Sequence, residues 1–77
     1  MNEELLSVKQ VSQVLKTNTA YVYRLRDAGL LKFMKLGTLK CRRSALDEFI
    51  RSMDGMDATD PEHIKPLDTE GAANEPD

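Results

Sequence analysis

Side chains suited to binding a polyanion cluster in the stretch YVYRLR, residues 21–26. Tyr21 and Tyr23 are followed by Arg24 and Arg26, so hydroxyl and guanidinium donors share one short segment. A guanidinium donates paired hydrogen bonds to guanine or to phosphate, and a tyrosine hydroxyl can donate to the same groups. The pattern favours binding of a nucleic acid over catalysis, because no Ser/His/Asp set accompanies it.

The charge of the chain is divided along its length. The formal net charge is −2, but residues 1–53 hold ten Lys and Arg against five Asp and Glu, which gives +5. Residues 54–77 hold one Lys against eight Asp and Glu, which gives −7. Such asymmetry hints at a nucleic-acid partner for the basic part, although +5 is also compatible with ordinary solubilising charge. We expect the acidic part to compete with phosphate for the basic face.

The composition argues against several other classes of protein. A chain of 77 residues predicts one small domain, with too little core for a large catalytic cleft, and we expect no enzyme. The single cysteine, Cys41, and the single histidine, His63, predict neither a disulfide nor a metal site, and no other cofactor is expected. The chain has no apolar run of membrane-spanning length and no secretory pattern, so we expect a cytoplasmic protein.

Capping residues and hydrophobic spacing predict a first short helix. Ser7 followed by Gln10 is a capping-box pattern, and apolar residues then recur at helical intervals. We therefore expect a helix over about 8–15, in which Val8, Val11, Val14 and Leu15 recur at helical spacing.

A second helix is expected over about 19–28. Thr17 or Asn18 can cap its start, and Gly29 lies where the chain leaves a helix with a positive φ angle. Its inward stripe is expected to consist of Val22, Leu25 and Ala28.

The hydrophobic period changes after the second helix, and two short runs flank Gly37-Thr38. A two-residue loop with glycine first suits a type II′ hairpin turn. In that register Leu36 faces Leu39 and Met34 faces Cys41 on the inner face. The outer face is then expected to hold Phe33, Lys35, Lys40 and Arg42.

A third helix is expected over about 45–53, with Ser44 as its N-cap and Asp47 at the capping-box position. Residues 54–77 include three prolines and few large apolar side chains. Such a segment buries too little surface to offset its ordering entropy, so we expect an acidic, disordered tail.

These elements predict a mainly α fold with a β-hairpin wing, that is, a winged helix-turn-helix. Residues 1–53 form the expected domain of three helices and a two-stranded hairpin, and 54–77 the disordered acidic tail. Two short helices joined by a few residues match a helix-turn-helix, whose second helix enters the major groove of double-stranded DNA.

A helical wheel identifies the candidate DNA-binding residues. With Val22 and Leu25 inward, Ala20, Tyr23 and Arg24 point outward, and Thr19 and Tyr21 lie on the flanks. Arg24 can read guanine, and Ala20 can touch a thymine methyl group. The cations of the hairpin can contact the phosphate backbone of the DNA. Packing is an equally open interpretation for either tyrosine. The complete set of candidates is Thr19, Ala20, Tyr21, Tyr23, Arg24, Lys35, Thr38, Lys40 and Arg42.

The order of these motifs resembles the small excisionase-type helix-turn-helix proteins of phages and integrative elements, which are related to the DNA-binding domain of MerR regulators. The resemblance rests on LLSVKQVSQVL, VYRLRDAGLL and KLGTLKCRRSALDEFI, and it covers about residues 5–52. Many relatives have glycine where this chain has Lys16, and an apolar residue where it has Arg26.

The resemblance implies a winged helix-turn-helix that binds DNA either as an excisionase or as a small transcriptional regulator. It gives Thr19, Ala20, Tyr23 and Arg24 the recognition-helix role, and it makes the Gly37-Thr38 hairpin the wing. The partners it implies, besides DNA, are an integrase or further copies of the chain. An alternative of another class is a protein-interaction adaptor with the same fold, which docks a partner through the tail or the second helix.

Overall fold

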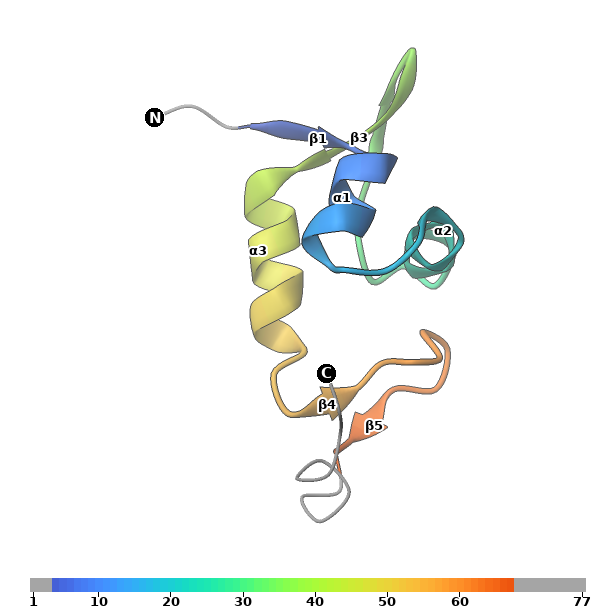
Figure 1. The fold of residues 1–77 in the computed structure, drawn as a ribbon, viewed down its shortest axis with the longest axis vertical. Helices are drawn as coiled ribbons and strands as arrows, with labels where there is room; N and C mark the ends of the chain where they lie inside the picture. Colours follow the sequence, from blue (N-terminus) through green and yellow to red (C-terminus); the bar gives the residue numbers. More distant parts are fainter. Residues whose placement is uncertain (1–3, 68–77) are drawn as a thin grey trace.

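The structure, a computed structural model, describes residues 4–67 (Figure 1). Its element order is β1 (Leu5–Ser7), α1 (Val8–Val14), α2 (Thr19–Asp27), β2 (Met34–Leu36), β3 (Thr38–Arg42), α3 (Arg43–Ser52), β4 (Met56–Asp57) and β5 (Lys65–Pro66). The expected three helices and the hairpin after α2 are confirmed, and the fold is that of a small winged helix-turn-helix.

The expected caps of the first two helices are confirmed. The Ser7 hydroxyl accepts a hydrogen bond from the amide of Gln10, and the Gln10 side chain accepts one from the amide of Ser7. The Asn18 side chain accepts from the amide of Tyr21 at 2.8 Å, so Asn18, not Thr17, caps α2. Each cap satisfies backbone donors that the first turn of a helix leaves without a partner.

The turn between α1 and α2 is built from a lysine in a conformation that favours glycine. Lys16 has φ +57°. Its amide donates to the carbonyl of Gln13 and the amide of Thr17 donates to the carbonyl of Ser12, which closes α1 with a Schellman motif. The chain can then reverse direction within a few residues and pack α2 against α1. Lysine thus takes a turn geometry that glycine adopts more readily.

The hairpin register differs by one residue from the expected one. Met34 pairs with Lys40, Lys35 with Leu39, and Leu36 with Thr38 across Gly37, so the prediction that Leu36 faces Leu39 and Met34 faces Cys41 is wrong. Gly37 has φ +81° and alone separates the paired residues.

A strand that was not predicted completes the sheet. β1 lies along the other side of β3, with Leu6 opposite Cys41, so the sheet order is β1-β3-β2. Both Leu6 and Cys41 are buried, and their pairing fixes which face of β3 meets the core. Lys40 and Arg42 consequently share the outer face of the sheet, whereas Lys35 lies on the opposite face. The expected row of three wing cations on one surface is therefore not formed.

The third helix begins earlier than expected. It starts at Arg43, with Arg42 in the N-cap position, so the prediction of Ser44 as N-cap is wrong. Because β3 runs directly into α3, no loop is left for Ser44 to cap the helix from. The Arg43 side chain instead contacts Asp47, one turn further on, at 3.1 Å.

Apolar side chains from the first sheet, the three helices and the loop before β2 meet in one core. α1 lies between α2 and α3 in Figure 1, and the hairpin extends away from the helices. The buried apolar residues are Leu6, Val8, Val11, Val22, Leu25, Leu31, Cys41, Leu46 and Phe49.

The prediction of a disordered tail from residue 54 onward is wrong for residues 54–67. Gly55, at φ +78°, turns the chain after α3, and β4 then pairs with β5 as a second antiparallel hairpin. We call residues 55–67 the C-terminal hairpin. Its loop turns back toward α2 (Figure 1). The rest of the expected tail, 68–77, lies outside the described residues.

The conformation of Lys16 makes a prediction about stability. A left-handed conformation costs a non-glycine residue about 1–2 kcal/mol, and a glycine loses part of that gain through its greater entropy when unfolded. We expect Lys16→Gly to raise the free energy of unfolding by about 0.5–1 kcal/mol in urea denaturation. Lys16→Ala is the control, and an equal gain in that variant would show that the φ angle is not the cause.

Candidate nucleic-acid interface

The exposed side of α2 is set by the burial of its other side. Val22 and Leu25 have no exposed surface. Thr19, Ala20, Tyr23 and Arg24 are exposed, as the helical wheel predicts. The structure thus places four of the expected site residues on the outward side of one helix, close to its N-terminal end.

Tyr23 and Arg26 lie against each other on this helix. The guanidinium carbon of Arg26 is 5.3 Å from the centre of the Tyr23 ring, a cation–π distance. Nε and Nη2 of Arg26 also donate to Asp27 at 3.1 and 2.9 Å. Asp27 therefore pairs with Arg26, and its charge is offset locally.

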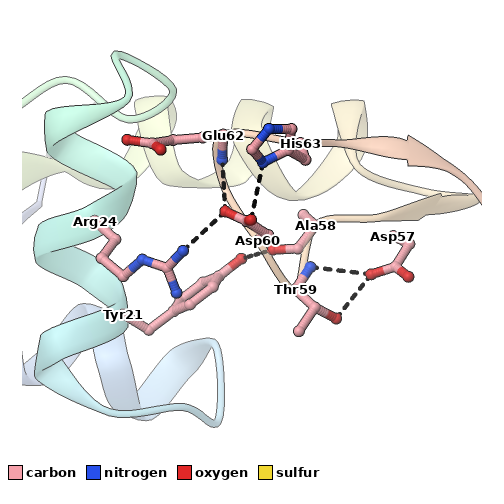
Figure 2. Close-up of polar contacts among 8 residues, drawn as sticks. All are labelled: Tyr21, Arg24, Asp57, Ala58, Thr59, Asp60, Glu62 and His63. Atoms are coloured by element: carbon pink, nitrogen blue, oxygen red, sulfur yellow. Dashed lines mark hydrogen bonds and ion pairs between the residues drawn. The ribbon is translucent and has the colours of Figure 1, made fainter.

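Tyr21 points away from the outward side and toward the C-terminal hairpin. Its ring packs against the core, and its hydroxyl donates to the backbone carbonyl of Ala58 (Figure 2). Burial raises the pKa of the Tyr21 hydroxyl, and the nearby charge of Arg24 partly offsets that increase. Of the two interpretations left open by the sequence, packing describes Tyr21 in this conformation.

Arg24 forms an ion pair with the C-terminal hairpin. Its Nη2 atom lies 2.8 Å from Oδ1 of Asp60, and the two side chains remain about half exposed, at 53% and 48% (Figure 2). Arg24, the cation expected to read guanine, is thus paired with a carboxylate from a segment that was expected to be disordered.

Asp60 is held by several partners at once. Its Oδ1 also accepts from the amide of Glu62 at 3.1 Å, and its Oδ2 lies 2.9 Å from Nδ1 of His63. The hydrogen bond from His63, followed by the one from the Glu62 amide, lowers the pKa of the Asp60 carboxyl below its usual value. The carboxylate is therefore charged at neutral pH.

Asp57, three residues before Asp60, is held by similar hydrogen bonds within its own loop. Asp57 accepts hydrogen bonds from the amide and the hydroxyl of Thr59, at 3.0 and 2.7 Å. These bonds lower the pKa of the Asp57 carboxyl. An aspartate bonded to the amide two residues later is a turn pattern. The sequence thus contains turn patterns that indicate order in this segment, namely Asp57 with Thr59, and Asp60 with Pro61 and Glu62. The expectation of disorder was based instead on the acidic composition of the whole segment.

The structure divides the expected wing residues between two faces. Thr38, Lys40 and Arg42 alternate along β3 and share the outer face with Ser7 and Met34, their neighbours in the sheet. Lys35 pairs with Leu39 on the other face and is exposed near the tip. The wing therefore presents cations on both faces.

Within residues 4–67, no group of three or more His, Cys, Asp or Glu side chains has an arrangement that could hold a metal ion. None of the described helices is long and apolar enough to cross a membrane.

The chain belongs to a helix-turn-helix domain family, whose model matches residues 5–54. This family includes excisionase-like small DNA-binding proteins. The match spans β1 to the end of α3, and it ends where the C-terminal hairpin begins. Searches of curated proteins and of solved structures found no significant match.

The hydrogen bond from the Tyr21 hydroxyl to the Ala58 carbonyl can be tested by mutation. Tyr21→Phe removes one hydrogen bond to the C-terminal hairpin, worth about 0.5–1.5 kcal/mol. We expect the amides of Thr59 and Glu62 to exchange with solvent about 2- to 10-fold faster, as measured by NMR. Tyr23→Phe removes a hydroxyl from the exposed side of the same helix and should leave these amides unchanged. Equal rates in wild type and Tyr21→Phe would contradict the contact.

The anchoring of Asp60 makes a prediction about pH. Its folded-state pKa lies below the usual 3.8, so its contribution to docking is complete above that value. The contribution is lost as the pH falls through the lower folded pKa. In an NMR titration of the carboxyl carbon, His63→Ala should raise the pKa of Asp60 more than Arg24→Ala does, because the His63 hydrogen bond is the largest cause. The reverse order would contradict this assignment.

Proposed function

We propose that this protein binds double-stranded DNA through α2, placed in the major groove, and that the β2–β3 hairpin lies against the adjacent backbone. The main support for this proposal is the set of side chains that α2 exposes on its outward side. Val22 and Leu25 anchor the helix in the core, and Arg24 stands among small and hydroxyl-bearing residues on the opposite side. That arrangement lets a helix approach base edges closely.

Membership of the helix-turn-helix family supports DNA as the partner. Within that class we propose an architectural or regulatory role, either in excision beside an integrase or in transcription. The proposal includes no catalytic step, because the residues of α2 and the wing can donate hydrogen bonds and neutralise charge but form no nucleophile–base pair. Arg24 is assigned to a guanine or a phosphate, and Thr19, Ala20 and Tyr23 to the surrounding groove.

The wing contributes cations that do not all face the same way. Arg24 together with two or three of the wing cations would neutralise three or four phosphates. Log K should then fall against log salt concentration with a slope of about −3 to −4, at roughly 0.9 per contact. A single copy is therefore a weak, salt-sensitive binder. Specific sites would need several copies, bent DNA or a second protein.

A protein-interaction adaptor remains the second candidate. The observation that favours it is the exposure of large apolar side chains on the two elements proposed to bind DNA, with Tyr23 of α2 at 42% and Leu36 of β2 at 58%. Aromatic side chains are frequent anchors in protein interfaces. An adaptor of this kind would bind duplex DNA weakly at every salt concentration, which separates the two candidates.

The test compares two arginines on different helices. Arg24→Ala should weaken binding to a random-sequence duplex and make the salt slope shallower by about 0.9 if Arg24 meets a phosphate. Fluorescence anisotropy between about 50 and 200 mM salt measures both quantities. Arg51→Ala, which removes an exposed arginine from α3, is the matched control and should have the smaller effect. Equal losses in the two variants, or binding that does not change with salt, would reject the role of α2.

A further inference from the structure

The C-terminal hairpin occupies one flank of α2. It leaves α3 at Gly55, pairs β4 with β5, and is closed by a hydrogen bond from the amide of Leu67 to the carbonyl of Gly55 at 2.9 Å. The loop between the two strands reaches α2 (Figure 1), where Ala58 and Asp60 meet Tyr21 and Arg24. The flank covered is the one that adjoins the outward side.

The contact with Asp60 uses the nitrogen that base recognition needs. A guanidinium binds guanine through two neighbouring nitrogens, either Nη1 with Nη2 or Nε with Nη2. Both pairs include Nη2, and Asp60 engages one of the two N–H groups of that nitrogen at 2.8 Å, so it competes with one of the two pairings. A carboxylate at this position also has the charge of a phosphate and repels any phosphate that approaches Arg24.

The carboxylate is fixed by its own segment, not by Arg24. The Glu62 amide and the His63 ring hold Asp60 from the loop side (Figure 2), and the following residue, Pro61, is buried. The Tyr21 hydroxyl fastens the same loop to α2 through the Ala58 carbonyl. The acid is thus presented to α2 in a defined position, as a bound anion would be.

The surrounding charge has the same sign. Residues 54–67 hold four carboxyl groups against one lysine, a formal charge of −3. The charges are carried by Asp54, Asp57, Asp60, Glu62 and Lys65. Any duplex that brings phosphates to the Arg24 flank of α2 must therefore also displace or tolerate this group of carboxylates.

We propose that the C-terminal hairpin is an intramolecular competitor for DNA that withholds Arg24 in the free protein. This inference rests on the proposed function, because it concerns regulation of the same helix. In the closed form, Thr19, Ala20, Tyr23 and Lys35 stay exposed, so weak binding continues. In the open form, the hairpin loop leaves α2, and Arg24 can reach a base or a phosphate.

The hold is weak enough to be reversible. Both side chains of the ion pair are about half exposed, and exposed pairs contribute little to stability because solvent screens their charges. A duplex offers many phosphates at once, so it can replace one carboxylate. The competitor therefore reduces affinity without abolishing it, and a protein that captured the hairpin loop would increase the affinity for DNA.

A double-mutant cycle on the full chain tests the proposal. At about 50 mM salt we expect Asp60→Asn to tighten binding to a random duplex about three- to tenfold. Asp54→Asn removes the same charge from a site with no contact to α2, and should tighten it by at most about twofold. In an Arg24→Ala background, Asp60→Asn should do no more than Asp54→Asn, because the withheld group is missing.

The outcomes separate the two ideas. If Arg24→Ala weakens binding but Asp60→Asn and Asp54→Asn have equal effects, the competitor is rejected and the proposed function stands. If Arg24→Ala and Arg51→Ala weaken binding equally, the role of α2 is rejected, and the competitor is rejected with it. A gain from Asp60→Asn that persists in the Arg24→Ala background would show general charge repulsion and also overturn the proposal.

NMR provides a second measurement on the unmodified chain. Addition of a random duplex should shift the amide signals of Ala58, Thr59 and Glu62 together with those of α2, because the loop must leave the helix. Shifts in α2 without shifts in the loop would mean that DNA binds with the hairpin in place, and would contradict the proposal.

Discussion

The burial of Val22 and Leu25 is the constraint on which the rest of the structure depends. Both side chains have no exposed surface, so α2 cannot rotate about its axis without exposing one of them at a cost of about 1.5–3 kcal/mol. Fixing this rotation decides which side of the helix is open and which flank meets the C-terminal hairpin. The position of Arg24 at the boundary between the two is therefore set by residues that are themselves buried in the core.

Features encoded by neighbouring residues could be predicted from the sequence. The capping box of Ser7 and Gln10, the cap at Asn18 and the stripe of Val22 and Leu25 each depend on residues within about one or two helical turns. The outward placement of Arg24 follows from the same stripe. The fold class could be predicted because all of these local preferences agree with it.

Features that depend on distant partners could not be predicted. β1 pairs Leu6 with Cys41, 35 positions along the chain, and no pattern of neighbouring residues indicates this pairing. A shift of one residue moved Lys35 to the other face of the sheet. The docking of the C-terminal hairpin likewise depends on contacts of Tyr21 and Asp60 with residues far away in the chain. The amino-acid composition of a segment does not indicate such contacts.

The two parts of the molecule are held by interactions of different kinds, and this difference has a functional consequence. The helices and the first sheet share a continuous apolar core. The contacts described between the C-terminal hairpin and α2 are a tyrosine hydrogen bond and an exposed ion pair. Apolar burial is indifferent to a polyanion, whereas an exposed ion pair competes directly with it. The helix α2 can therefore keep its position while the hairpin loop leaves it. An exposed and always charged guanidinium would suit Arg24 to bind a phosphate. The same property lets the Asp60 carboxylate bind Arg24 where a phosphate would otherwise bind.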